Sequence, residues 1–343
     1  MAERDAVDPG ALGAWLAAHV DGASGGVRVD QLAGGSSNLT FRVRDGVNDW
    51  VLRSPPLRHV LATAHNMKRE YTVQTALRGT DVPVPRTVGF CDDASVIGRP
   101  FYLMDRLDGI VFAVADDVAH LTADQALAAT RELADVLARL HAVDPAAVGL
   151  DGFGRPAGFI ERQVGRWITQ WEASKQRELP EIDEVARLLL AHLPPEGAPA
   201  IVHGDYSFNN TMFRRDDPAR MLAVLDWELS ALGDPLTDVG MLASYWSEVG
   251  ELLWRRRSPQ PHQGHPGFGS VDVLIDRYAT ISGRDVGHLD FYRALATFKL
   301  ACIAEGAHAR RVKAGETGRV DDADDAVRAL AGLALDAASR LHG

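Results

Sequence analysis

Alternation of apolar and polar residues predicts a group of short strands in the first third of the chain. The first two predicted strands are joined by residues 33–38, which are rich in Gly and Ser and are typical of a hairpin turn. A helical pattern over 64–77 interrupts the series. The predicted strands cover residues 27–32, 39–43, 50–53, 87–90 and 100–104.

Helical periodicity dominates the remainder. Residues 122–141 carry Leu and Val at three- and four-residue spacing, begin at the capping residue Thr122 and end before Asp144-Pro145. The same pattern predicts helices over 159–175, 182–192, 271–280, 290–311 and 321–341, and Asp8-Pro9-Gly10 predicts another near the N-terminus. The pattern therefore predicts an α+β protein with a β-rich part at 1–106 and a larger, mostly helical part at 107–343. Residues of about 150–198 form a helical insert in the second part.

Two apolar runs end in acidic residues near the middle of the chain. Ile201-Val202 leads into His-Gly-Asp, with Asn210 five residues after Asp205, and Val224-Leu225 leads into Asp226. Phosphoryl transfer needs a carboxylate that orients and deprotonates the accepting hydroxyl, and oxygen ligands that hold Mg²⁺ on the phosphates. We therefore predict that Asp205 is the catalytic base and that Asn210 and Asp226 bind Mg²⁺. The alternative is that the two Asp residues only cap strand ends.

The motif His-Gly-Asp-x-x-x-x-Asn, followed by Asp-Trp-Glu, resembles that of the aminoglycoside phosphotransferase family and its choline- and homoserine-kinase-like relatives. Val51-Leu52-Arg53, Arg69-Glu70-Tyr71 and residues 232–236 are similar to a subgroup that includes kinase-like domains fused to acyl-CoA dehydrogenases. The resemblance implies a bilobal protein-kinase-like fold, with a hairpin and one helix in the β-rich N-lobe. It also implies ATP and Mg²⁺ as cofactors and transfer of the γ-phosphate to a hydroxyl of a small molecule. The fused architecture suggests a hydroxyacyl-CoA.

The resemblance also implies a nucleotide site. The Gly/Ser turn would cover the phosphates, and Arg53 stands where the family has a phosphate-binding Lys, with Glu70 as its partner. Backbone groups at Asp105 and Leu107, in the connector between the lobes, would contact adenine. Arg keeps the charge, but its planar fork does not replace Lys freely. The predicted nucleotide-binding residues are Gly34, Gly35, Ser36, Ser37, Asn38, Arg53, Glu70, Asp105 and Leu107.

Two further groups of residues follow from the resemblance. The counterparts of His203, Asp234 and Asp238 support the catalytic loop. The helix at 159–175 lies in the insert, where relatives bind substrates, and its Trp and Arg side chains could hold an apolar, anionic acceptor. Packing and solvated charge are the alternative for each of them. The predicted acceptor-binding residues are Arg162, Arg166, Trp167 and Trp171.

Charge and composition narrow the classes of partner. Lys and Arg number 36 and Asp and Glu 47 among 343 residues, so the net charge of −11 argues against nucleic acid and anionic membranes. Only two cysteines are present, which excludes a disulfide framework and fits a reducing compartment. The apolar run at 11–20 is too short for a membrane span and lacks the pattern of a signal peptide, so we expect a cytoplasmic protein. Residues 258–270, rich in Pro, Gly and His, are predicted to form a mobile loop.

Three functions remain open at this stage. The leading one is an ATP- and Mg²⁺-dependent kinase of small molecules, and the second is a nucleotide-binding module without turnover. The third is an aminoglycoside kinase, which would need an acidic acceptor site for polycations, whereas the insert offers Arg and Trp. A protein kinase is disfavoured because Gly204 replaces the Arg that would bind a phosphorylated activation loop, and Glu228 replaces the Gly of Asp-Phe-Gly.

Overall fold

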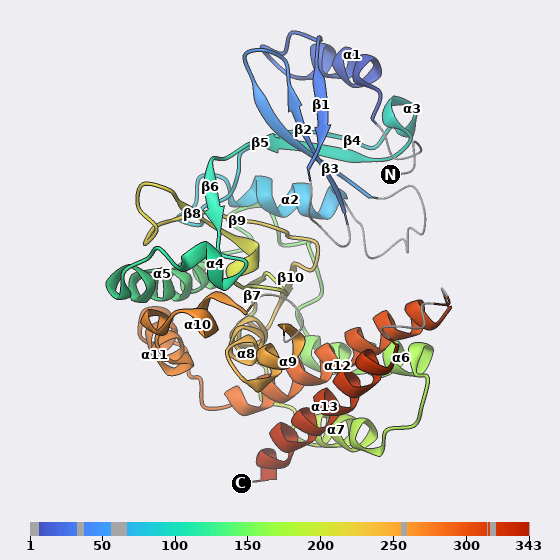
Figure 1. Ribbon diagram of the computed structural model, residues 1–343, viewed down its shortest axis with the longest axis vertical. Helices are drawn as coiled ribbons and strands as arrows, with labels where there is room; N and C mark the ends of the chain where they lie inside the picture. The colour runs from blue at the N-terminus through green and yellow to red at the C-terminus, as the bar shows by residue number, and fades with distance from the viewer. Residues whose placement is uncertain are drawn as a thin grey trace. The chain divides into compact units, whose positions relative to one another are not determined.

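The computed structural model describes residues 7–32, 38–55, 67–254, 259–313, 315 and 320–342. The chain forms two compact units (Figure 1). The first comprises Met1–Gly109 together with Leu222–Ser230, and the second comprises Ile110–Met221 and Ala231–Gly343. The short return of the chain at 222–230 places Asp226 in the first unit. The boundary predicted between residues 106 and 107 stays a prediction.

An antiparallel five-stranded sheet forms the centre of the first unit, in the order β1-β2-β3-β5-β4. All five predicted strands are present with slightly shifted bounds. Figure 1 shows α1 and α3 on one side of this sheet and α2 on the other. The elements are α1 (Pro9–His19), β1 (Arg28–Gln31), β2 (Leu39–Arg44), β3 (Asp49–Ser54), α2 (Met67–Leu77), β4 (Thr87–Cys91), α3 (Ala94–Ile97) and β5 (Phe101–Asp105).

Strand alternation sorts the side chains of this sheet into two faces. On one face, Phe41, Leu52 and Leu103 are buried in a core that also contains Leu12 and Leu16 of α1. The opposite face carries the side chains that are one position out of phase. There Arg53 of β3 stands opposite Tyr102 of β5 in the register, on the side covered by α2. The same alternation that builds the core therefore directs Arg53 toward the helix that carries Glu70.

The second unit is mostly helical, as the sequence predicts. Its long helix α12 packs against α8, α6 and α13. Two further small sheets are present: β10 pairs antiparallel with β7, and a three-stranded sheet has the order β6-β8-β9. Its helices are α4 (Ala115–Val118), α5 (Ala123–Ala142), α6 (Phe159–Ser174), α7 (Pro180–Ala191), α8 (Leu236–Tyr245), α9 (Glu248–Trp254), α10 (Pro261–Gly264), α11 (Val271–Ser282), α12 (Leu289–Lys313) and α13 (Val320–Ser339), with 3₁₀ turns η2 (Phe208–Asn210), η3 (Pro266–Phe268) and η4 (Arg340–His342). The strands of the two small sheets are β6 (Gly109–Val111), β7 (Ala200–Val202), β8 (Thr211–Arg214), β9 (Met221–Val224) and β10 (Ala231–Gly233).

One predicted loop is wrong. The described residues 259–270 contain α10 and η3, each with a proline in its first turn. His262 stacks on Trp246 at 4.5 Å between ring centroids, and Phe268 is buried. Proline at a first helical position costs no hydrogen bond, so the Pro residues that suggested a loop begin short helices instead.

The predicted catalytic loop follows β7, and buried side chains fix its position. Residues Ala200–Val202 are all buried, and Gly204 then adopts φ +85°, a conformation that glycine reaches without strain. Tyr206 is buried and donates a hydrogen bond to the carbonyl of Leu133 at 2.9 Å. Phe208 packs in an aromatic cluster with Phe112, Phe213 and Phe268. The loop therefore packs against buried apolar side chains.

Among the described residues, no helix combines the length and apolar character that crossing a bilayer requires.

Candidate active site

Arg53 is the centre of a buried charged network in the first unit. Its Nε lies 3.3 Å from Oε2 of Glu70 on α2, so the pairing predicted from the sequence is present. Its terminal nitrogen also donates to Oδ1 of Asp226 at 3.1 Å. The second contact was not predicted, and it links the proposed phosphate-binding cation directly to a proposed Mg²⁺ ligand.

Glu70 is fully buried and is held by three neighbours. Its carboxylate accepts hydrogen bonds from the Asn38 amide at 2.9 Å and the Tyr102 hydroxyl at 3.0 Å, besides facing Arg53. Burial raises the pKa of Glu70 to about 7, although the charge of Arg53 opposes the shift. Burial alone would lower the pKa of Arg53, but the surrounding acidic groups outweigh it and raise that pKa above its usual value. Arg53 therefore stays charged in the network.

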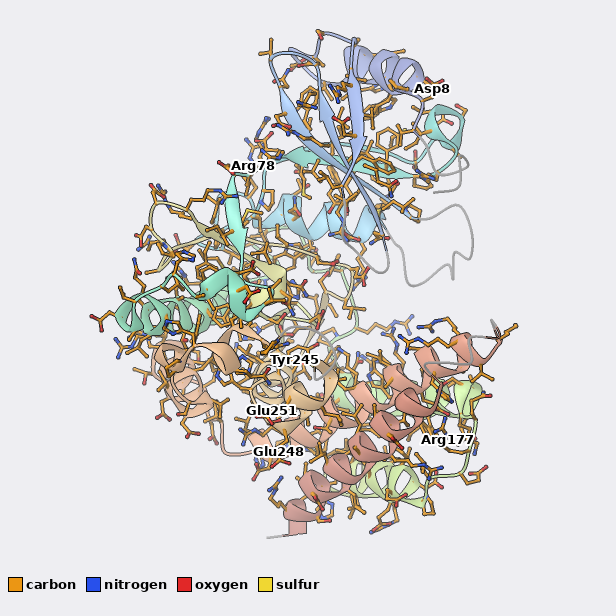
Figure 2. The ribbon with its side chains drawn as sticks, in the orientation of Figure 1. Asp8, Arg78, Arg177, Tyr245, Glu248 and Glu251 are labelled. Carbon is orange, nitrogen blue, oxygen red and sulfur yellow. The ribbon has the colours of Figure 1, made fainter. Side chains whose placement is uncertain are left out.

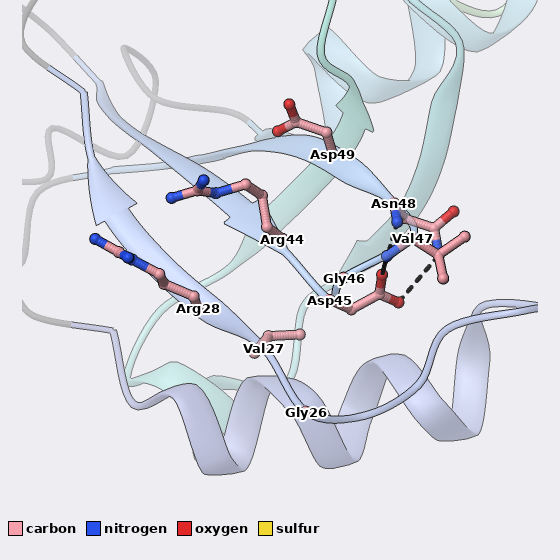
Figure 3. Close-up of a pocket in the computed structure, with 9 residues that line it drawn as sticks. All are labelled: Gly26, Val27, Arg28, Arg44, Asp45, Gly46, Val47, Asn48 and Asp49. Atoms are coloured by element: carbon pink, nitrogen blue, oxygen red, sulfur yellow. Dashed lines mark hydrogen bonds between the residues drawn. The ribbon is translucent and has the colours of Figure 1, made fainter.

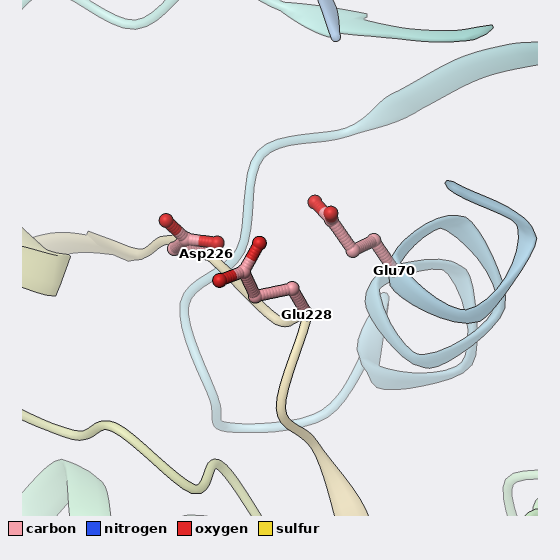
Figure 4. A group of neighbouring side chains, drawn as sticks. All are labelled: Glu70, Asp226 and Glu228. Atoms are coloured by element: carbon pink, nitrogen blue, oxygen red, sulfur yellow. The ribbon is translucent and has the colours of Figure 1, made fainter. Parts of the chain in front are cut away.

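A group of three carboxylates surrounds this arginine. Glu70, Asp226 and Glu228 each place one oxygen within 4.8 Å of the others, and Figure 4 shows their carboxylates turned toward one another. Asn38 also donates to Glu228 at 3.1 Å. Asp226 has φ +63°, a left-handed conformation uncommon outside glycine, and such strain clusters at functional sites. Clustered carboxylate oxygens are the ligands that Mg²⁺ prefers, so this donor set fits the metal expected from the sequence. Glu228 was not among the predicted ligands.

The second unit holds the proposed base. Oδ1 of Asp205 accepts a hydrogen bond from the hydroxyl of Tyr245 at 2.7 Å, and Oδ2 accepts one from the Asn210 amide nitrogen at 2.8 Å. Asn210 donates to the Asp205 carbonyl as well, also at 2.8 Å. Tyr245 ends α8 (Figure 2), and burial together with the charge of Asp205 raises its pKa well above the usual value, so it remains a donor. The carboxylate is thus fixed in orientation by two neutral groups.

Asp238 makes the contacts that a brace of the catalytic loop requires. It is fully buried on α8 and accepts the backbone N–H groups of His203 at 2.6 Å and Gly204 at 2.7 Å. Its carboxylate also lies 3.2 Å from Nε2 of buried His141. His203 is buried, with its Nδ1 3.2 Å from the backbone N–H of Asp205.

Asp234 contacts the start of α8 and the next long helix. It accepts from the backbone N–H of Leu236 at 2.9 Å and from the hydroxyl of Tyr292, on α12, at 2.6 Å. These contacts explain why a carboxylate is useful at the beginning of a helix, where backbone N–H groups lack partners.

The residues predicted to bind the acceptor separate into two groups. Trp171 is 2% exposed and lies in the core, which is the packing alternative left open by the sequence. Arg162 donates to the backbone carbonyls of Ala157 and Arg155. Trp167 is buried as well, at 9% exposure, whereas Arg166 is exposed and its guanidinium lies over the Trp167 ring, 5.4 Å from its centroid.

Lys299 on α12 is a residue that the sequence analysis missed. Its ammonium donates to the carbonyl of Gly204 at 2.7 Å, one residue before the proposed base, and lies 5.8 Å from the centroid of the Trp167 ring. A signal was available, since Lys299 is the only charged residue between Arg293 and Glu305. Tyr245 carried no comparable signal.

The remaining predicted nucleotide residues give less information. Gly34, Gly35, Ser36 and Ser37 lie outside the described residues. The side chain of Asp105 forms two hydrogen bonds with Arg86, both at 2.8 Å, and Leu107 follows in the connector toward β6. Asn38, Arg53, Glu70 and Asp226 belong to the first unit, whereas Asp205, Asn210 and the supporting residues belong to the second.

A groove of about 720 Å³ opens at the edge of the first unit, between the start of β1 and the β2–β3 turn (Figure 3). None of the predicted nucleotide-binding residues that the structure describes lines it. Its two arginines, Arg28 and Arg44, both contact the carboxylate of Asp30. The groove therefore offers no unpaired charge of the kind that phosphates need.

Comparison with known proteins connects these residues to a family. Residues 28–266 match the model of the phosphotransferase enzyme family, APH. The chain is 34% identical over 311 residues to acyl-CoA dehydrogenase family member 11 from Rattus norvegicus, which covers 87% of this chain and 39% of that protein. It thus spans about two-fifths of the length of this relative.

Solved structures give the same fold. A crystal structure from Ralstonia eutropha JMP134, of a protein provisionally called an aminoglycoside phosphotransferase, is 34% identical with a TM-score of 0.84, covering 98% of this chain and 99% of that one. A complex of aminoglycoside phosphotransferase APH(4)-Ia with ADP and hygromycin B is 18% identical with a TM-score of 0.61, covering 94% and 97%. These likenesses confirm the predicted α+β, kinase-like fold.

Proposed function

This chain belongs to the phosphotransferase enzyme family, and we propose that it transfers the γ-phosphoryl group of ATP to a hydroxyl of a small molecule. The observation that carries the proposal is the setting of Asp205. Its two carboxylate oxygens are oriented by Tyr245 and Asn210, on a loop whose backbone is bound by buried Asp238. A carboxylate held in this way is suited to orient a hydroxyl and accept its proton during transfer.

The metal and the nucleotide would use the charged network of the first unit. One guanidinium, that of Arg53, is surrounded by three carboxylates, so the group is short of positive charge and favours a cation. Asp226 and Glu228 would hold Mg²⁺ in the first unit, and Asn210 in the second unit remains a predicted ligand. When bound, Mg²⁺ would neutralise charge on the phosphates. Arg53 has further donors for a phosphate oxygen, because a guanidinium presents five N–H groups.

The identity of the acceptor is a finer proposal. The rat relative is named as an acyl-CoA dehydrogenase family member, and the match to this chain covers 39% of its length. A kinase fused to such an enzyme suggests a hydroxyacyl-CoA as the phosphorylated alcohol. The proposed acceptor side of this chain carries Arg166 and Lys299, which argues against a polycationic aminoglycoside.

Replacement of the base tests the proposal. We expect Asp205→Asn to lower the kcat of phosphoryl transfer by roughly 10²–10⁴-fold, because general-base positioning is lost. The rate would be measured as ADP release with a panel of hydroxyacyl-CoAs and amino alcohols. Its affinity for ATP, measured by calorimetry, should stay close to that of the wild type. Asp216→Asn is the matched control, since Asp216 pairs only with Arg214 at the surface. Turnover at the wild-type rate in Asp205→Asn would show that Asp205 is a structural residue.

A second candidate is a nucleotide-binding module without turnover. The contact between Arg53 and Asp226 favours it, because a metal ligand already bound to a guanidinium must be released before it can coordinate Mg²⁺. The same experiment separates the two functions. ATP binding by the wild type with no ADP release for any acceptor, and no change in Asp205→Asn, would support the module.

A further inference from the structure

Lys299 is half-buried beside the proposed base and forms no ion pair among the described residues. Its ammonium has three donors, and the hydrogen bond to the Gly204 carbonyl accounts for one of them. Burial lowers the pKa of Lys299, while the nearby charges of Asp205 and Asp238 oppose the shift. The two oxygens of Asp205 accept hydrogen bonds from Tyr245 and Asn210, and the hydrogen bond of the ammonium goes to the Gly204 carbonyl instead.

A second cation lies close to the first. Arg166 of α6 is exposed, and its guanidinium shares the Trp167 ring with the ammonium of Lys299. Burial is the main cause of the lowered pKa of Lys299, and the positive charge of Arg166 lowers that pKa further. In the part of the chain that the structure describes, Arg166 has no ion pair either. Two neighbouring cations without a carboxylate partner are unexpected in a chain with 47 acidic and 36 basic residues.

The two cations near the Trp167 ring repel each other, and a bound anion would relieve this repulsion. Like charges near one aromatic ring repel each other, and cation–π attraction to a single Trp is modest, about 0.5–2 kcal/mol. An anion bound between the two side chains would remove the repulsion and satisfy the spare N–H groups of Lys299 through charge-assisted hydrogen bonds.

We infer that Lys299 and Arg166 bind an anionic group, a carboxylate or a phosphate, of the acceptor whose hydroxyl reaches Asp205. The inference rests on the proposed function and specifies its substrate class as an acidic alcohol. Lys299 contacts the residue directly before the base, so the anion is bound near the reacting hydroxyl. Arg166 belongs to the helical insert. Lys299 and Arg166 therefore determine specificity for the acceptor.

Matched pairs of alcohols provide the test. Affinities would be measured by calorimetry on the full chain for 3-hydroxybutyrate against 1,3-butanediol, and for glycerol 3-phosphate against glycerol. A third pair is 3-hydroxybutyryl-CoA against its neutral N-acetylcysteamine thioester. We expect the wild type to bind at least one anionic member roughly 10- to 100-fold more tightly than its neutral counterpart, as charge-assisted hydrogen bonds predict. The pair that shows the preference distinguishes a carboxylate from a phosphate and from coenzyme A.

The variants attribute the preference to the two residues. Lys299→Met keeps an apolar stem of similar length and should abolish most of the preference, and Arg166→Gln, at an exposed position that cannot disturb the core, should reduce it. Lys313→Met, at the exposed end of the same helix, is the matched control and should keep it. Equal binding within every pair, no binding of any probe, or an unchanged preference in both variants would overturn the inference. So would a loss of ATP affinity in Lys299→Met with the acceptor preference intact.

The binding assay requires no turnover. If phosphoryl transfer fails while the preference for anions holds, only the proposed function is wrong. If the preference fails while ADP release still depends on Asp205, only this inference is wrong.

Discussion

Arg53 contacts two carboxylates that have different proposed tasks. Glu70 is buried on α2 and would place the guanidinium, whereas Asp226 would bind the metal. Because Arg keeps its charge, the network cannot relax by losing a proton from Arg53. It can relax if another cation takes over Asp226 or if a phosphate takes a share of the guanidinium. The arrangement in this structure is therefore suited to a site that exchanges protein carboxylates for ligand charges.

A double-mutant cycle tests this coupling. We expect Arg53→Ala and Glu70→Ala each to weaken ATP binding, and the double variant to lose less than the sum. Contacting charged residues typically show interaction energies of about 0.5–3 kcal/mol. Arg53→Lys serves as the charge-conserving control and should retain much of the affinity. Strict additivity in the measured ATP affinities would mean that the 3.3 Å contact carries no energy in nucleotide binding.

Single residues were predictable where a motif fixed their spacing. Asp205, Asn210 and Asp226 follow from the catalytic-loop pattern, and the pairing of Arg53 with Glu70 follows from the family resemblance. Tyr245 and Lys299 were missed because they reach the loop from helices 40 and 95 residues away. Such contacts depend on how α8 and α12 pack, and no local spacing rule connects them to Asp205. Sequence therefore proposes the reacting groups, whereas the groups that contact them become visible only in the structure.

Elements were predictable in proportion to their length and their caps. The helix α5 was recognised from periodicity and from Thr122, and α12 from its apolar stripe. The four-residue helices α3, α4 and α10 were not recognised, because one turn contains too few residues to show a period. The strands of the first unit alternate clearly and were all recognised. Their pairing order, β1-β2-β3-β5-β4, arises from contacts between distant residues and was not predicted.

The N-terminus of α5 allows a test at this scale. The Thr122 hydroxyl accepts from the Gln125 N–H at 3.2 Å, and the Gln125 side chain accepts from the Thr122 N–H at 2.9 Å. We expect Thr122→Ala to lower the free energy of unfolding in urea by about 1 kcal/mol, the usual cost of losing an N-cap. Thr169→Ala, at an exposed position inside α6, is the control and should change stability by less than about 0.5 kcal/mol. Equal effects of the two substitutions would show that the capping box contributes nothing.

For the whole molecule, the net charge is opposite in sign to the two side chains proposed to bind the acceptor. The chain carries −11, yet the side chains near the catalytic loop include Lys299 and Arg166 without acidic partners among the described residues. Long-range attraction of an anionic substrate is therefore weak, and binding depends on short-range contacts. Salt should weaken the binding of an anionic acceptor only modestly, because partly buried charges are screened less than exposed ones.

Stability toward acid is a property of the whole molecule to which His262 contributes in a predictable direction. Its ring is stacked on Trp246, and burial lowers its pKa from 6.5 to about 4. The folded protein therefore binds fewer protons than the unfolded chain between these two values. The contribution of His262 is fully present above pH 6.5 and is lost as the pH falls toward 4, by roughly 3 kcal/mol at most.

Other groups also titrate in this range, so the measured quantity is the difference between the wild type and His262→Gln in the slope of unfolding free energy against pH. We expect a flatter slope between pH 6.5 and 4 in His262→Gln, and no change in His120→Gln, whose side chain is exposed. Identical slopes in all three proteins would mean that the ring takes up its proton as readily when folded as when unfolded.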